Sequence, residues 1–465
     1  MCDEFLLTSP TAVEIFALIR DLPIIDYHCH LIPGEISGNK RWRNITELAL
    51  SGDHYKWRLM RANGVPEKFI TGNGSDEEKF FHWCATIEDC IGSPIYHWTH
   101  LEMRRYFNYD GPVDADNAKK IFEYCNKIIA GDFSAWTILK KFKVEQIGTT
   151  DDPADSLEFH FQMKEHRKAN PELPVVYPTF RPTGVLNIEA EGFADYIAKL
   201  GSAVGYGIES IAGLQRVLSE RMDFFQKVGC RISDHALDPP VYLHPSEGLS
   251  PDNIFCKALS GVALTSDEVN IYKTALMTFL GCEYAKRGWV MQLHMGAQRN
   301  NNTVMAKTLG ADTGYDSMSD AGYSRSLAGL LDDINMSGGL PKTILYGLNP
   351  SSDTMLATMT GNFQGGGVKG KIQWGAPWWF NDTKAGIENH LTTLANCGVL
   401  AGFTGMLTDS RSFMSYPRHE YFRRILANTL AGWADRGEFP GDMKKLKQIA
   451  EGIAYRNAET YFKGE

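Results

Sequence analysis

Eight short apolar runs recur along the chain, and each ends abruptly in polar, glycine or proline residues. Most of the runs are separated by stretches whose apolar residues recur at helical spacing. Strands that alternate with helices and carry polar residues at their carboxyl ends are typical of a parallel (β/α)8 barrel, so we predict an α/β fold of that type. The runs, with their polar tips, are residues 24–30, 144–152, 175–182, 230–235, 290–296, 343–350, 371–375 and 405–410.

Three stretches depart from this alternation. Residues 34–143 are helical in pattern, irregular, and rich in aromatic and charged residues, which predicts a large, mostly helical insertion after the first strand that could form a lid. Residues 11–22 and 418–433 carry apolar stripes and predict a lead-in helix and a closing helix against the barrel. No linker, repeat or low-complexity tract divides the chain, so we expect residues 1–465 to form a single domain.

Charge and hydropathy limit the functions open to the chain. The formal net charge of −9 argues against a general nucleic-acid binder, because such proteins present a basic face. No stretch of eighteen apolar residues occurs and the amino end lacks a signal-peptide pattern, so we expect a cytoplasmic protein without a membrane partner. The nine cysteines include no Cys-x-x-Cys pair, which is typical of reduced thiols. Formation of a homo-oligomer is left open.

The first run, Ile24-Ile25-Asp26-Tyr27-His28-Cys29-His30, contains two histidines separated by one residue. Side chains alternate along a strand, so His28 and His30 are predicted to share a face and to reach one divalent cation. In a closed barrel the eighth strand lies beside the first, which would bring Asp409 to the same place. Two imidazoles and a carboxylate, with positions left for water or substrate, describe a catalytic metal site. The alternative for the two histidines alone is a structural place in the core.

Further polar and aromatic side chains follow the other runs, and at the carboxyl ends of barrel strands they would gather at one end of the barrel. His294 would be another metal ligand or a hydrogen-bonding partner of one. Asp151-Asp152-Pro153 also suits a helix-starting turn, the tryptophans could be core or a wall that stacks on a sugar, and Arg411 could pair with Asp409 or cap the closing helix. The whole set comprises Asp151, Asp152, Arg181, Asp234, His235, His294, Trp378, Trp379 and Arg411.

These tips together resemble the amidohydrolase superfamily, in which strand one supplies His-x-His, strand five a histidine and strand eight an aspartate. Many members also have a carbamylated lysine on strand four and a histidine on strand six, whereas these runs end in Ile232-Ser233-Asp234-His235 and Leu348-Asn349-Pro350, which disfavours a centre with two metals. The likeness narrows to the uronate isomerase family. Segments similar to that family are 26–31, 53–58, 97–102, 149–153, 179–182, 292–294, 299–302, 378–382, 407–413 and 418–424.

The resemblance implies an aldose–ketose isomerase that interconverts D-glucuronate with D-fructuronate, and D-galacturonate with D-tagaturonate. A proton moves between C2 and C1 through an enediol, which needs a base, an acid and positive charge near the developing oxyanion. The resemblance implies that Asp409, or the water it shares with the metal, is the base and that Tyr55 is the acid, with His28 also in the catalytic group. It implies one divalent metal, expected to be zinc, on His28, His30 and Asp409.

A substrate carboxylate calls for arginine, whose planar fork pairs with it through two hydrogen bonds. The candidates are Arg181, Arg299 and Arg411, and the resemblance adds His54, Asp234, His294 and Trp379 as substrate contacts. Without the resemblance, Tyr55 would be assigned to aromatic packing. Two rival functions stay open: a metal-dependent hydrolase or deaminase of the same superfamily, and a sugar-acid binding protein without catalysis.

Overall fold

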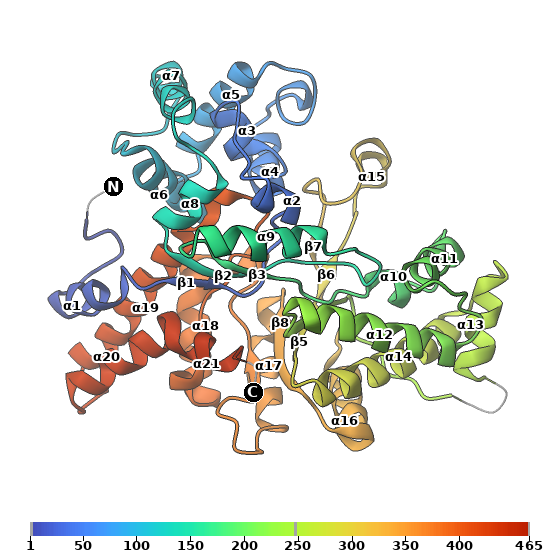
Figure 1. Cartoon of the computed structure of the whole chain (residues 1–465). Helices are drawn as coiled ribbons and strands as arrows, with labels where there is room; N and C mark the ends of the chain where they lie inside the picture. Colours follow the sequence, from blue (N-terminus) through green and yellow to red (C-terminus); the bar gives the residue numbers. More distant parts are fainter. Residues whose placement is uncertain (1–2, 246–248, 464–465) are drawn as a thin grey trace.

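The computed structural model describes residues 3–245 and 249–463, which form an α/β fold (Figure 1). Parallel strands are present at the first seven of the eight predicted positions. The structure adds a short antiparallel hairpin, β6 and β7, that no pattern predicted. The strands are β1 Ile24–Asp26, β2 Val144–Gly148, β3 Val175–Tyr177, β4 Ile232–Leu237, β5 Val290–Met295, β6 Ala297–Gln298, β7 Ser317–Met318, β8 Lys342–Gly347 and β9 Ile372–Trp374.

The parallel strands pair in chain order. One sheet contains β1, β2 and β3, and another contains β4, β5, β8 and β9. Parallel bridges from Phe180, to Asp151 on one side and to Ser233 on the other, join the two sheets edge to edge. The parallel strands of the two sheets therefore lie side by side in chain order. Their carboxyl ends lie at the same end of the sheets, as the sequence predicted.

The eighth predicted strand is the exception, because residues 403–410 form no regular strand. The segment still lies against the end of β1: the backbone N–H of Asp409 donates to the carbonyl of His28, and that of His30 donates to the carbonyl of Ser410. Positive φ angles at Gly405 (80°) and Asp409 (46°) interrupt the extended conformation and prevent a regular ladder. The predicted neighbour of the first run is confirmed, and the predicted strand at that position is wrong.

Helices connect the strands and surround them (Figure 1). The predicted lead-in and closing helices are α1 and α19, which pack against each other. The α-helices are α1 Pro10–Ile19, α2 Pro33–Ser37, α3 Ile45–Leu50, α4 His54–Ala62, α5 Asp76–Glu88, α6 Pro94–Phe107, α7 Ala118–Ile129, α8 Ala135–Lys141, α9 Glu158–Ala169, α10 Thr183–Leu186, α11 Phe193–Val204, α12 Ile211–Val228, α13 Pro251–Leu259, α14 Ser266–Lys286, α15 Thr303–Leu309, α16 Ser324–Gly338, α17 Asp353–Gly361, α18 Lys384–Cys397, α19 Pro417–Asp435, α20 Met443–Glu451 and α21 Asn457–Tyr461.

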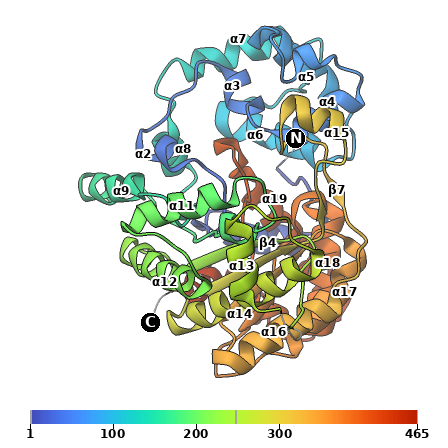
Figure 2. The same ribbon diagram turned by 90° about the vertical axis from the view of Figure 1, so that its right-hand side faces the viewer.

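Helices α2 to α8 all lie between β1 and β2, in the interval predicted as an insertion. In Figures 1 and 2 most of them gather on one side of the strands (blue to teal), and α15 stands on that same side. Local signals start these helices: Ser75 and Glu78 form a capping box at α5, and Ser134 caps α8. Trp83 and Phe107 are buried here and belong to the same hydrophobic core as residues of α1 and α19.

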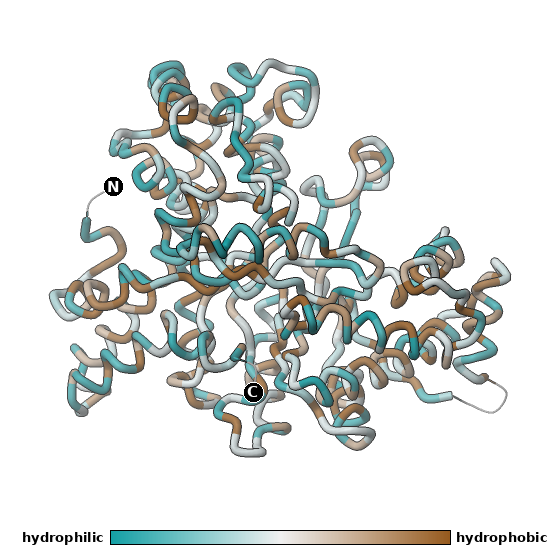
Figure 3. Tube along the Cα trace, in the orientation of Figure 1, coloured by the Kyte–Doolittle hydropathy of each residue, from teal (hydrophilic) through white to brown (hydrophobic). Residues whose placement is uncertain are grey.

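The central strands are the most hydrophobic part of the trace, whereas the helices alternate between hydrophobic and hydrophilic residues (Figure 3). Every residue of β5 is buried, as expected for a parallel strand covered on both faces. That burial includes His294, whose polar ring therefore needs a partner inside the protein. Among the described residues, no helix combines the length and the apolar content that crossing a bilayer requires.

His390 on α18 is a buried titratable group far from water. Its ring is 1% exposed and packs on Trp374, 4.2 Å between ring centroids, and on Phe403, 5.0 Å away. Burial lowers the pKa of His390 to about 3. The unfolded chain accepts this proton at about pH 6.5 and the folded protein does not. The stabilising contribution of His390 is therefore fully present above that pH and is lost as the pH falls toward 3.

Replacing His390 with phenylalanine removes this titration while keeping a ring in place. We expect the wild-type protein to lose about 3 kcal/mol more free energy of unfolding than His390→Phe between pH 7 and pH 4. Urea unfolding of both proteins at the two pH values measures the difference. Equal losses in the two proteins would show that His390 does not titrate in this way.

Candidate active site and metal centre

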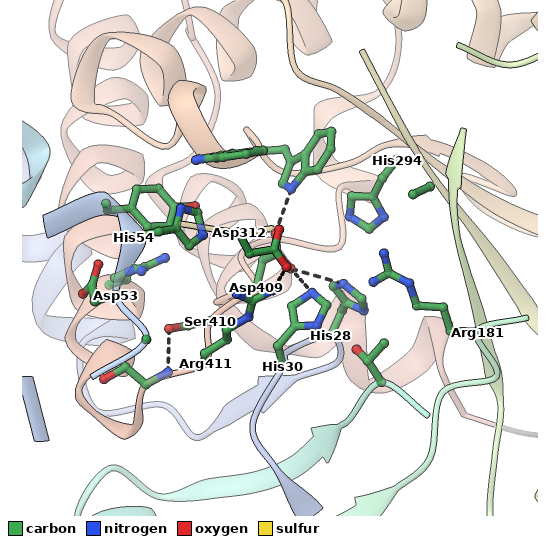
Figure 4. Close-up of a pocket in the computed structure, with 18 of the residues that line it drawn as sticks. His28, His30, Asp53, His54, Arg181, His294, Asp312, Asp409, Ser410 and Arg411 are labelled. Atoms are coloured by element: carbon green, nitrogen blue, oxygen red, sulfur yellow. Dashed lines mark hydrogen bonds and ion pairs between the residues drawn. The ribbon is translucent and has the colours of Figure 1, made fainter. Parts of the chain in front are cut away.

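His28, His30 and Asp409 meet at one point, as predicted. Nε2 of His28 lies 3.3 Å from Oδ1 of Asp409, and Nε2 of His30 lies 3.1 Å from the same oxygen. Ligand atoms about 2.0–2.1 Å from a tetrahedral ion are about 3.3–3.4 Å apart, so the spacing suits one divalent cation. Figure 4 shows both imidazoles directed at the carboxylate. Because β1 ends at Asp26, the two rings converge beyond the strand and not within it.

The second oxygen of the Asp409 carboxylate is held by the neighbouring aromatic segment. Nε1 of Trp378 donates a hydrogen bond of 2.7 Å to Oδ2, which leaves Oδ1 facing the histidines. Burial by itself would raise the pKa of Asp409, but the interactions with His28 and His30 hold it well below its usual range. The group is therefore an anionic carboxylate beside two imidazoles, which is the donor chemistry that zinc and similar divalent ions prefer.

Asp26 fixes the backbone from which Asp409 projects. Its fully buried carboxylate accepts hydrogen bonds from the backbone N–H of Thr408 (2.7 Å) and from Thr408 Oγ1 (2.6 Å). These bonds join β1 to the residue before Asp409, in the segment that has no regular ladder. Asp26 therefore helps to set the distance between the histidines and the carboxylate.

With zinc as the probe of this candidate site, we expect Asp26→Ala to weaken binding of the divalent ion about 10- to 100-fold, the usual cost of losing a group that holds a metal ligand in place. Competition with a zinc chelator measures this affinity, with far-UV circular dichroism to confirm folding. Asp26→Asn keeps an acceptor for Thr408 and should bind zinc more tightly than the alanine variant. Wild-type affinity in a folded Asp26→Ala protein would show that the segment keeps its position without this contact.

Asp234, on β4, connects three of the predicted residues. It is fully buried, with Oδ1 2.7 Å from Nδ1 of His294 and Oδ2 3.0 Å from Nη1 of Arg181. Burial opposes ionisation of Asp234, but Arg181, His28 and His294 hold its pKa well below the usual range. His28, Asp234 and His294 also have the spacing of metal ligands. Because Arg181 already neutralises Asp234, that second group is better explained as support for the first.

His54 and Tyr55, which belong to the insertion, lie in the same cavity as the candidate metal ligands. The side chain of Asp53 accepts a hydrogen bond from the backbone N–H of Lys56, so α4 begins with His54 and Tyr55 in its first turn. Their rings stack 4.8 Å apart, and the Trp379 ring lies 5.3 Å from His54 and 6.3 Å from Tyr55. These three rings form an aromatic wall of the site.

Tyr55 is kept in its protonated form. Burial raises its pKa well above the usual value, and the charge of Arg418 lowers it by less. The guanidinium of Arg418 lies 5.7 Å from the centroid of the Tyr55 ring and 4.1 Å from that of Trp98. A tyrosine in this form keeps an O–H group that can donate a hydrogen bond into the cavity.

The three predicted arginines reach the site, and each has an acidic partner. Arg181 pairs with the buried Asp234. Nε of Arg299 lies 3.3 Å from Asp238, and Nη2 of Arg411 lies 2.7 Å from Asp312. Arg411 neither pairs with Asp409 nor caps α19, so both alternatives for it are wrong. Asp312 lies between β6 and β7, outside the segments that the sequence singled out.

A cavity of about 320 Å³ brings these groups together, at the lower end of the 300–1,000 Å³ that is usual for small-molecule sites. The predicted residues that line it are His28, His30, His54, Tyr55, Arg181, His294, Arg299, Trp378, Trp379, Asp409 and Arg411, while Asp234 lies behind the wall. Further polar residues also line the cavity. Asp53, Thr150, Ser412 and Arg418 stand in the motif segments without an assigned role, and Asp312 stands outside them.

Three other candidate residues make contacts that support the fold. Asp151 accepts hydrogen bonds from Thr149 Oγ1 and the backbone N–H of Thr179, and Asp152 accepts one from the N–H of Ala154. Residues 152–155 form a turn, but α9 begins only at Glu158, so this turn does not start the helix. His235 is 1% exposed, lies beside the Tyr284 ring and does not line the cavity.

A family model described as glucuronate isomerase matches residues 1–462. The chain belongs to this family. Uronate isomerases from Caldanaerobacter subterraneus subsp. tengcongensis and Caldicellulosiruptor saccharolyticus are each 50% identical to it over 463 residues, covering 99% of this chain and 98% and 99% of theirs. The family prediction made from the motifs is thus confirmed over nearly the full length.

Solved structures agree with the glucuronate isomerase family assignment. The crystal structure of uronate isomerase from Thermotoga maritima is 34% identical, covers 100% of this chain and 99% of its own, and superposes with a TM-score of 0.93. That of glucuronate isomerase from Caulobacter crescentus is 22% identical, covers 99% and 96%, and has a TM-score of 0.90, which supports the shared fold.

Proposed function

We propose that the protein interconverts D-glucuronate with D-fructuronate, and D-galacturonate with D-tagaturonate. The observation that carries this proposal is a single cavity that holds His28, His30 and Asp409 beside three arginines. A hexuronate has a carboxylate at one end, which arginine binds, and the reacting C1–C2 pair at the other. Membership of the glucuronate isomerase family supports the same reaction.

We assign one divalent metal ion, proposed to be zinc, to His28, His30 and Asp409. The buried Oδ1 of Asp409 faces two imidazole nitrogens, and a depressed pKa keeps this carboxylate ionised, so the residues present fit the ion. When bound, such an ion polarises a substrate oxygen and stabilises negative charge that develops on it.

Side chains of the cavity can bind the substrate and carry out the two proton transfers of the isomerisation, one at carbon and one at oxygen. Arg299 and Arg411 bind the substrate carboxylate, while Arg181, His54, His294 and Trp379 position the remainder of the sugar. The Asp409 carboxylate accepts the proton from C2 and returns it at C1. Tyr55 Oη donates a proton to the oxygen on C1 as the enediol forms and recovers one from the oxygen on C2. His28 orients the carboxylate of Asp409 through the contact between Nε2 and Oδ1.

Nuclear magnetic resonance of D-glucuronate incubated with the zinc-loaded protein tests this proposal. We expect ketose signals to appear, and solvent deuterium to enter the sugar during turnover. Failure to convert any hexuronate, with hydrolysis of an amide or lactone instead, would favour the rival hydrolase. Binding of hexuronates without exchange at C2 would favour the sugar-acid binding protein. The three arginines of the cavity weigh against the hydrolase, which has no general need for them.

We further infer a single domain, residues 1–465, in which the helical insertion of residues 34–143 supplies His54 and Tyr55 and covers the site. The shared core between the insertion helices and α19 supports this organisation. The placement of the histidines, Asp409 and His294 supports membership of the amidohydrolase superfamily. We propose a cytoplasmic enzyme without nucleic-acid partners, in keeping with its net charge of −9.

A further inference from the structure

A carboxylate of the protein itself already occupies the pair of arginines assigned to the substrate. Oδ2 of Asp312 lies 2.7 Å from Nη2 of Arg411, and Oδ1 lies 3.8 Å from Nη1 of Arg299. The two oxygens of one carboxylate thus face two different arginines. Asp312 lines the same cavity as the metal-site residues and is labelled with them in Figure 4.

We propose that Asp312 is an internal stand-in for the substrate carboxylate, which displaces it from Arg411 when a hexuronate binds. The inference rests on the proposed function of Arg299 and Arg411. Asp312 keeps both guanidinium groups in the cavity before substrate arrives. It also makes every incoming anion compete for them, so small acids that lack the other contacts of the sugar bind poorly.

The surroundings of the three arginines indicate which ion pair opens. Arg181 is tied to Asp234, which is fully buried and has no exposed position to move to. Arg299 has a second partner in Asp238, whose side chain is 15% exposed. The Asp312 and Arg411 side chains, by contrast, are 39% and 41% exposed. An ion pair so exposed is screened by water and weak, so a substrate carboxylate can replace it.

The backbone around Asp312 is hydrogen-bonded to the insertion. Separation of Asp312 from Arg411 therefore needs only a rotation of the Asp312 side chain. Nη1 of Arg61 donates to the carbonyl of Thr313 (2.5 Å), and Nη1 of Arg58 donates to that of Asp316 (2.6 Å). Both arginines belong to α4, the helix that begins with His54 and Tyr55. The Asp316 side chain also accepts a hydrogen bond from the backbone N–H of Asn300, 2.6 Å away. The segment that carries Asp312 and the helix that carries Tyr55 are therefore one connected wall.

Replacing Asp312 with asparagine tests the proposal, because the amide is similar in size but cannot compete as an anion. We expect the KM for D-glucuronate and the inhibition constant of acetate each to fall about 1.5- to 5-fold, the range for loss of one exposed ion pair. Binding of D-glucose, which has no carboxylate, should not change. Asp132→Asn is the matched control, since it removes the same charge at a side chain that is 88% exposed and outside the cavity.

A KM and an acetate inhibition constant that rise or stay the same in Asp312→Asn would overturn the proposal. An equal change in D-glucose binding would overturn it too, because it would point to altered cavity shape. Calorimetric titration with acetate, which is not a substrate, repeats the comparison without turnover. Failure of the proposed function would appear separately, as absence of isomerisation by the wild-type protein whatever its affinity for these acids.

Discussion

Asp409→Asn is expected to lower kcat for D-glucuronate by about 10³-fold or more, because it removes both the proposed base and the anionic metal ligand. The asparagine carbonyl can still accept the hydrogen bond from Trp378 Nε1, so the side chain should keep its place. Initial rates of ketose formation measure the loss, and zinc content by elemental analysis shows whether the metal is lost with it. The amide cannot take up the C2 proton, so supplying excess zinc should not restore the rate.

The surface variant Asp132→Asn controls for the loss of one negative charge. It should retain wild-type activity and zinc content, because its partner Arg41 lies 3.8 Å away in an exposed pair. Isomerisation by Asp409→Asn at close to the wild-type rate would remove Asp409 from the mechanism.

Tyr55→Phe is expected to lower kcat by about 10²- to 10⁴-fold, the usual contribution of a positioned acid, and to change KM for D-glucuronate little. Phenylalanine keeps the aromatic contacts with His54 and Trp379 and removes only the hydroxyl. Steady-state kinetics with D-glucuronate provide both parameters. Zinc content should stay at the wild-type level, which distinguishes this variant from Asp409→Asn.

Tyr124→Phe is the matched control for the tyrosine variant. Tyr124 also belongs to the insertion, where its hydroxyl donates to the carbonyl of Phe107, and it does not line the cavity. Its loss should leave kcat and KM unchanged. If Tyr55→Phe turned over at the rate of Tyr124→Phe, Tyr55 would belong to the aromatic packing that the sequence offered as its alternative.

Local patterns predicted the strands because burial repeats with a short period along the chain. The runs that became β5 and β8 are mostly apolar and almost entirely buried, as parallel strands covered on both faces require, whereas β2 includes the exposed Glu145. The run at residues 405–410 has a similar composition, yet it forms no ladder. Positive φ angles at Gly405 and Asp409 interrupt its extended conformation, and residue composition does not reveal them.

The sequence predicted those site residues whose side-chain type by itself indicates a metal ligand or a carboxylate-binding group. His28, His30, Asp409 and the three arginines stand where polar tips follow apolar runs, and the structure brings them into one cavity. Asp312 carries no such signal, since it comes from a polar interval between two short strands. It reaches the cavity because Arg58 and Arg61 of α4 hold its segment there.

The sequence by itself determined seven of the parallel strands and their order, the metal-type donor set and the family, because these depend on residue types and on periodicities of a few residues. Only the tertiary structure decided how the donors are held. Asp26 binds Thr408 across 382 positions of the chain, and Arg411 meets Asp312 across 99. Such contacts form only when the folded chain brings distant segments together, so short-range patterns cannot encode them.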